Sequence, residues 1–213
     1  MKNKELSLIT LFIISSLWVY AYFPIENIFQ QLSLVIVFFG LFPFLFNKFF
    51  LKKPLTFFGF KFGDWKQGVI WSFFSLIGVI FVLLVLIKFF NFFEKYTVPS
   101  FIVYDFWNFV FYEFCLVFLF VWIYEIYFRG FILATFEVRI GYWAILLQTI
   151  VFTFLVLNLG GASLYLFLPY LIFAPFAGLI YCKSRSILYS GVTQFLIIFI
   201  LNVLIIGRVL GKI

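Results

Sequence analysis

Long runs of apolar residues, separated by short polar segments, repeat along the whole chain. Seven runs stand out, at residues 6–24, 31–50, 67–90, 107–128, 141–158, 162–182 and 186–207. Each is close to the length of about 20 residues that a helix needs to cross a bilayer. Because a helix satisfies its own backbone hydrogen bonds in lipid, each run is predicted to form a transmembrane helix. We therefore expect an all-α polytopic bundle of about seven spans, forming a single integral-membrane domain over residues 1–213.

Composition and charge agree with this interpretation and predict an orientation. The chain is 66% hydrophobic and 11% charged, whereas soluble domains are about 25% charged. One predicted side carries eleven of the 15 basic residues: Lys2, Lys4, Lys48, Lys52, Lys53, Lys61, Lys66, Arg129, Arg139, Lys183 and Arg185. The positive-inside rule then predicts that the N-terminus lies on the cytoplasmic side of the membrane. The membrane is expected to be a bacterial-type inner (plasma) membrane. An even number of spans stays open, and the basic excess indicates contact with membrane lipids rather than with nucleic acid.

Two charged side chains interrupt the fourth run near its predicted end. Glu125 and Arg129 are four residues apart, so they share a helix face and can neutralise each other. Two interpretations stay open: a pair that fixes helix packing at the membrane boundary, or part of a functional site. Glu113 lies twelve residues before Glu125, about 120° away around an ideal helix, so the two carboxyl groups are not expected to share a face.

The other buried polar candidates are amides. Gln148, Asn158, Gln194 and Asn202 lie in or at the ends of later runs. Amides in membrane helices commonly hydrogen-bond to neighbouring helices, which is the simplest interpretation of each one taken alone. The chain has no histidine and two cysteines, so neither a metal site nor a cofactor is expected.

A resemblance to a known family enters at the stretch from Glu125 to Leu133. This stretch resembles the EExxxR motif of the CAAX-protease and bacteriocin-processing (CPBP) family, also called Abi proteins, which are intramembrane endopeptidases. The family continues with a helix ending in FxxxH and a later helix bearing HxxxN or HxxxD. Here the corresponding stretches are Phe154xxxAsn158 and Gln194xxxIle198. The resemblance covers about residues 105–205 and implies a CPBP-type core there.

The same resemblance shows which catalytic positions are substituted. By position, the family's first Glu, assigned as the base that activates water, is Tyr124 in this chain. The two family histidines, assigned to a metal or to an oxyanion, are Asn158 and Gln194, and amides cannot take up a proton near neutral pH. Glu125 is the one titratable carboxylate left, and its pairing with Arg129 weakens it as a base. The candidate catalytic residues are thus Glu125 and Arg129, and Tyr124, Asn158 and Gln194 are expected to line a cavity.

Three functions of different class follow from these residues. The first is a non-proteolytic protein that binds a lipidated peptide, a lipid or a partner helix in an intramembrane cavity, and the loss of catalytic residues favours it. The second is an active endopeptidase that processes membrane-anchored peptides. The third is a membrane enzyme or subunit that acts in acyl modification of lipoproteins. Whether the chain is an enzyme therefore stays open, and the expected partners are membrane lipids, a lipidated peptide or a partner membrane protein.

Overall fold

The computed structural model describes residues 3–23, 28–159 and 163–211, and each secondary-structure element in these ranges is helical. The elements are α1 (Asn3–Tyr22), α2 (Ile28–Val35), η1 (Ile36–Leu41), α3 (Phe42–Phe46), η2 (Asn47–Leu51), η3 (Leu55–Phe58), α4 (Trp65–Phe90), α5 (Phe92–Lys95), η4 (Ser100–Ile102), α6 (Phe106–Phe111), η5 (Tyr112–Val117), α7 (Phe118–Tyr124), η6 (Glu125–Leu133), α8 (Ala134–Ile140), α9 (Trp143–Leu159), α10 (Ser163–Ser184) and α11 (Ile187–Val209). Of these, η1, η2, η5 and η6 are π-helical, and η3 and η4 are 3₁₀ turns.

Several elements join into longer helices that can span a membrane. The described residues contain six helices long and apolar enough for this, two of which are composite: Leu32–Leu51 and Phe106–Ile140. A shorter apolar helix, at Trp143–Leu157, adds a seventh candidate. These helices confirm the predicted all-α polytopic bundle.

Polar caps fix where three of the helices begin. Asp64, Asp105 and Ser186 each precede a helix and accept a hydrogen bond from a backbone N–H of its first turn, at 2.8–3.1 Å. Such a cap satisfies an N–H group that has no partner inside the helix. The starts of α4, α6 and α11 are therefore set by short local signals that the sequence carries.

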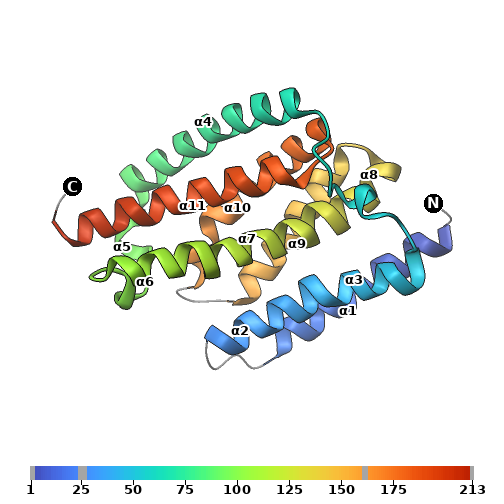
Figure 1. Ribbon diagram of the computed structural model, residues 1–213, viewed down its shortest axis with the longest axis horizontal. Helices are drawn as coiled ribbons and strands as arrows, with labels where there is room; N and C mark the ends of the chain where they lie inside the picture. Colours follow the sequence, from blue (N-terminus) through green and yellow to red (C-terminus); the bar gives the residue numbers. More distant parts are fainter. Residues whose placement is uncertain (1–2, 24–27, 160–162, 212–213) are drawn as a thin grey trace.

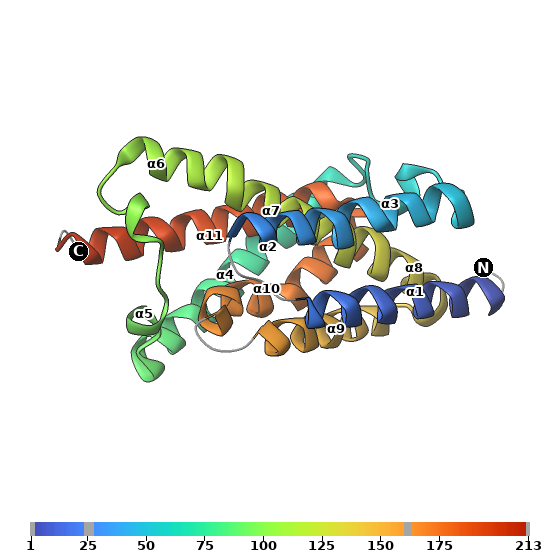
Figure 2. The same cartoon turned by 90° about the horizontal axis from the view of Figure 1, so that it is seen from below.

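The helices pack around α10 and α11. Helix α10 contacts α4, α9 and α11, and α11 also contacts α7 and η6. In Figure 1, α7 lies between α11 on one side and α2 and α3 on the other. The view from below in Figure 2 adds that α1 runs beside α9. The termini lie at opposite ends of the bundle (Figure 1), as an odd number of spans requires.

One end of the bundle is closed by a loop that packs against the turn between α10 and α11. The backbone N–H of Asp64 donates to the Ser184 carbonyl at 2.8 Å, and that of Ile187 donates to the Gly59 carbonyl at 3.1 Å. Between these contacts Gly63 has φ +58°, and a Cβ atom there would collide with the Ser184 carbonyl. Glycine is required at this position by both its backbone angle and its surroundings.

We expect Gly63→Ala to lower the free energy of unfolding by about 1–3 kcal/mol through backbone strain, with a further loss from the collision. Thermal unfolding in detergent measures the change. Gly211→Ala is the matched control, because Gly211 has φ +66° but a Cβ added to it would meet no atom within 4 Å. Equal losses in the two variants would show that the close packing on Ser184 contributes nothing.

Candidate functional site

Glu125 lies deep in a helix and not at its end. The sequence predicted that the fourth span stops at residue 128, near the membrane boundary, but the helix continues to Ile140 and ends at Gly141, which has φ +56°. At 1.5 Å per residue, Glu125 is about 22 Å from that end. The predicted end of the span was wrong because Arg129 does not lie at the end of the helix. A charge that is compensated within the protein does not mark the membrane surface.

The Glu125 carboxylate has two partners and no exposure to solvent. Its Oε1 lies 3.3 Å from Nη1 of Arg129, four residues later in the same helix, and the side chains of Glu125 and Arg129 are 0% and 1% exposed. Its Oε2 accepts a hydrogen bond from the Ser190 hydroxyl of α11. The structure thus joins the two candidate catalytic residues and adds Ser190, which sequence reasoning did not single out.

A glycine explains how α11 comes close enough for this contact. A Cβ on Gly191 would lie 3.3 Å from the Trp122 ring and 3.5 Å from Cγ of Glu125. A larger side chain would push α11 away from Glu125 and separate the Ser190 hydroxyl from the carboxylate. The neighbouring small residues Ser190 and Gly191, one turn before Gln194, are the sequence signal from which this contact could have been found.

Tyr124 occupies the position at which the family resemblance places the water-activating Glu. It is 0% exposed. Its ring lies within 5.8–6.4 Å, centroid to centroid, of six aromatic rings: Phe39, Phe120, Phe128, Phe152, Phe167 and Tyr170. Stacked and edge-to-face aromatic pairs at these separations are favourable. The Tyr124 ring is therefore packed within a cluster of aromatic side chains.

Two other residues, Gln194 and Asn158, are predicted to line the cavity. Gln194 is 1% exposed on α11, four residues after Ser190, and its Oε1 has no hydrogen-bond partner among the described residues. Asn158 belongs to α9, but its side chain lies outside the residues that the structure describes. The role of Tyr124, Asn158 and Gln194 in lining a cavity stays a prediction.

A second polar contact joins the same two helices at their other end. Glu113 Oε1 accepts a hydrogen bond from Nδ2 of Asn202 at 2.6 Å, twelve residues from the Glu125–Ser190 contact on each helix. The expectation that Glu113 and Glu125 do not share a face was wrong, because both contact α11. The π-helical turn η5 supplies the reason: one extra residue reduces the angle between them to about 20°.

On another side of this helix lies an apolar groove of about 450 Å³. Its lining comes from the Leu32–Leu51 helix, the Leu55–Phe60 segment and the α7–η6 helix: Ile36, Gly40, Leu41, Pro43, Phe44, Asn47, Leu55, Phe58, Phe60, Leu119, Ile123, Ile126 and Phe131. The one polar side chain, Asn47, is hydrogen-bonded at 3.0 Å to both the N–H and the carbonyl of Lys53. The side chains that line the groove therefore form an apolar surface, because the one polar side chain among them is already hydrogen-bonded.

The donor set around Glu125 does not fit a metal ion. Zinc sites in proteins are built from Cys, His and carboxylate ligands. In the part of the chain that the structure describes, no three His, Cys, Asp or Glu side chains come together, and Glu125 is already engaged by Arg129 and Ser190.

The fold and the site define an integral membrane protein, a helical bundle with a buried acid–base pair at its centre. Residues 106–200 match the family model described as type II CAAX prenyl endopeptidase Rce1-like. This match supports membership of the CAAX-protease (CPBP) family for this region of the chain. Neither a search of curated proteins nor a search of solved structures found a match.

We expect the Glu125–Arg129 pair to contribute strongly to stability. Glu125→Gln keeps the shape of the side chain but leaves the buried guanidinium without its counter-charge, which costs about 3–5 kcal/mol. Glu125→Gln combined with Arg129→Met should recover part of this loss. Thermal unfolding in detergent measures both.

Glu94→Gln is the control, because Glu94 pairs with Arg208 at 4.0 Å with both side chains exposed, and such surface pairs contribute about 0–1 kcal/mol. An unchanged melting temperature in Glu125→Gln would refute a structural role for the buried pair.

Proposed function

We propose that this protein is a non-proteolytic member of its family that holds the hydrocarbon chain of a lipid or lipidated peptide in the apolar groove. The observation that carries the proposal is Tyr124, an aromatic side chain packed among six other rings at the position of the family's general base. The groove supplies the binding surface.

The chemistry left at the site argues against peptide hydrolysis. General base catalysis needs a titratable group within hydrogen-bond reach of the attacking water. Tyr124 is enclosed by rings, and Gln194 is an amide that does not accept a proton near neutral pH. Glu125 directs one oxygen to Arg129 and the other to Ser190, so it already has partners where a base would need a water molecule.

The groove has the size and polarity for a hydrocarbon chain. Its volume of about 450 Å³ lies within the range of about 300–1,000 Å³ typical of ligand sites. Every CH₂ group that binds there leaves water at a gain of about 0.8 kcal/mol if the chain comes from solution. Gly40 lines the groove, and a Cβ on it would meet no atom within 4 Å, so this wall is open.

The orientation of the protein is part of the proposal. The Gly59–Asp64 loop and the α10–α11 turn meet at one end of the bundle, and the basic residues Lys61, Lys183 and Arg185 lie in or beside them. By the positive-inside rule this end and the N-terminus face the cytoplasm.

Single-cysteine labelling in intact cells tests the orientation. Cys115 and Cys182 are first replaced by Ser, and Lys61→Cys or Lys95→Cys is then introduced. Lys61 and Lys95 are exposed and lie at opposite ends of α4. A membrane-impermeant maleimide should label the variant at residue 95 and leave the one at residue 61 unlabelled until the cells are opened. The reverse pattern would overturn the topology.

Photocrosslinking tests the groove. The probe is a farnesylated peptide with a diazirine in its isoprenoid chain, and a palmitoyl lipid with the same group serves as the second probe. We expect labelling of the groove in the wild-type protein and its loss in Gly40→Phe, because the new ring fills open space. Leu84→Phe, a substitution on the exposed face of α4, should label like wild type. Equal labelling of all three proteins would exclude the groove as the binding site.

The alternative is an active endopeptidase acting on membrane-anchored peptides, which the family match over residues 106–200 favours. In that case the farnesylated probe would be recovered in two pieces after incubation, and Glu125→Gln would stop its cleavage. Recovery of the intact probe from the wild-type protein is the result that the non-proteolytic function requires.

A further inference from the structure

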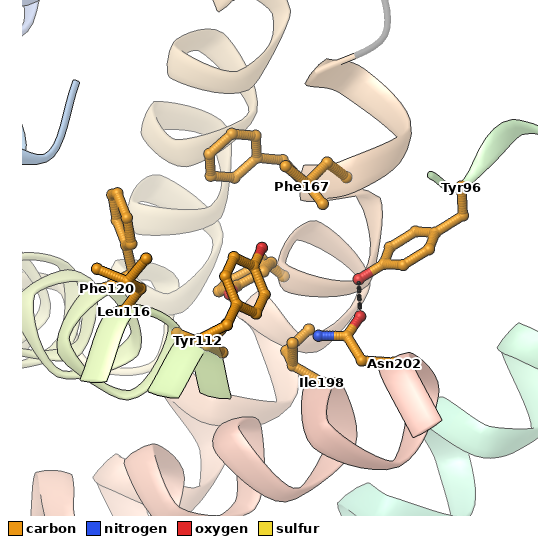
Figure 3. Close-up of a pocket in the computed structure, with 10 residues that line it drawn as sticks. Tyr96, Tyr112, Leu116, Phe120, Phe167, Ile198 and Asn202 are labelled. Carbon is orange, nitrogen blue, oxygen red and sulfur yellow. Dashed lines mark hydrogen bonds between the residues drawn. The ribbon is translucent and has the colours of Figure 1, made fainter. Parts of the chain in front are cut away.

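Two spaces other than the apolar groove have polar groups in their walls. The smaller is a cavity of about 70 Å³, where the Tyr96 hydroxyl donates to Oδ1 of Asn202 at 2.8 Å (Figure 3). The described residues that line this cavity carry no charge. The larger space, of about 300 Å³, lies between residues 56–61, α8 and the C-terminal end of α10. Its lining includes Lys61, Glu137 and Arg185, and we call it the polar pocket.

The wall of the polar pocket carries an excess of positive charge, because two cations face one carboxylate. Arg185 donates a hydrogen bond from Nη1 to Oε2 of Glu137, so these two side chains compensate each other. Lys61 is exposed and has no ion pair or ring contact among the residues that the structure describes. The charge of Lys61 is therefore available to a ligand in the pocket.

A second lysine lies between the polar pocket and the apolar groove. The backbone N–H and carbonyl of Lys53 are hydrogen-bonded to the side chain of Asn47, which lines the groove. Its Nζ lies 5.8 Å from the centre of the Phe57 ring, which lines the polar pocket. Such a contact with a ring attracts a cation but leaves its charge in place. Lys53 therefore adds positive charge at the boundary between the two spaces.

The polar pocket and the groove adjoin along two segments of the chain. In η3, Phe58 lines the groove and its neighbour Phe57 lines the polar pocket. In the helix formed by η6 and α8, Phe131 lines the groove and Ala134, three residues later, lines the polar pocket. A helix with its side chains is about 10–12 Å across, so the two spaces are separated by about that distance or less. One molecule can therefore reach both, with an apolar part in the groove and a polar part in the pocket.

The charges around the polar pocket favour an anionic ligand. Lys61 and Lys53 repel a cation, and Glu137, which could attract one, is already paired with Arg185. Phosphate oxygens accept strong hydrogen bonds from ammonium and guanidinium groups. The volume of about 300 Å³ is at the lower end of the range of about 300–1,000 Å³ for ligand sites, which suits a compact group. A phosphate headgroup attached to a hydrocarbon chain matches both the polar pocket and the groove beside it.

We propose that the polar pocket binds the phosphate group of a membrane lipid that has a net negative charge, with Lys61 as its main counter-ion. An acyl chain of the same lipid lies in the apolar groove. This inference rests on the function proposed above and adds the chemical class of the headgroup. Soluble phosphate esters carry the same anionic group, so the experiment compares the two sources.

The test titrates delipidated full-length protein in a neutral detergent with dioleoylphosphatidylglycerol and measures binding by native mass spectrometry. Dioleoylphosphatidylcholine is the comparison, because it has the same chains but no net charge. We expect the wild-type protein to bind phosphatidylglycerol about fivefold or more tightly than phosphatidylcholine. Lys61→Gln should remove most of this preference, since a hydrogen bond between charged groups is lost, and Lys61→Arg should keep it.

Lys66→Gln is the matched control. Lys66 is also exposed, in the first turn of α4, but it lies over the Trp65 ring at 6.0 Å and does not line the polar pocket. The substitution removes the same charge from the same end of the bundle, so this variant should bind both lipids like the wild type. Equal effects of Lys61→Gln and Lys66→Gln would show a general attraction of the basic end for anionic lipid and would overturn the proposal.

Two further measurements separate the possible outcomes. Glycerol 3-phosphate, which has no acyl chain, should not compete with phosphatidylglycerol at equal concentration, and competition would refute a lipid as the occupant. Gly40→Phe should weaken binding of both lipids, because the new ring fills the groove. If it does so while Lys61→Gln keeps the wild-type preference, the groove stands and the polar pocket is refuted. If Lys61→Gln loses the preference while Gly40→Phe binds both lipids fully, the phosphate site stands and the function proposed for the groove is refuted.

Discussion

The arrangement at the centre of this protein depends on one constraint: a charge buried within a membrane bundle must be compensated by the protein. Glu125 and Arg129 meet this constraint within one helix, and Ser190 adds a hydrogen bond from the helix packed against it. A solitary charge there would be costly, and the hydrogen bond from Ser190 to the compensated Glu125 carboxylate links α11 to the Phe106–Ile140 helix. Gly191, packed against Trp122, gives the close approach of the two helices that this contact needs.

Around this pair, two positions expected to carry catalysis make packing and charge-pair contacts in the structure. Tyr124 packs among aromatic rings, and Glu125 serves as a counter-ion. A family fold can keep its helix packing while its chemistry is lost, since the packing depends on shape and charge compensation and the chemistry on a few titratable groups. The apolar groove, which lies on another side of the same helix, does not depend on those groups.

Much of the fold was predictable from sequence because lipid imposes a simple length and polarity rule. Six of the seven predicted runs match helices whose ends differ by about three residues or less. The fourth run did not match at its C-terminal end. In the sequence, a charged pair that is neutralised within a helix resembles the polar residues at the end of a membrane span. The sequence also did not predict that Glu113 and Glu125 lie on the same face of the helix. The residue pattern does not indicate the π-helical turn at Tyr112–Val117 that brings them together. Ser190 was missed because the small pair Ser190 and Gly191, one turn before Gln194, was not interpreted as a sign of close helix packing.

We expect that the site around Tyr124 does not support peptide hydrolysis. The most direct measurement incubates the purified protein with a prenylated peptide in water enriched in oxygen-18 and analyses the peptide by mass spectrometry. We expect intact peptide with no incorporated label. A cleaved product carrying one labelled oxygen, formed by the wild type and absent with Glu125→Gln of equal folded yield, would contradict the claim and establish Glu125 as a catalytic base.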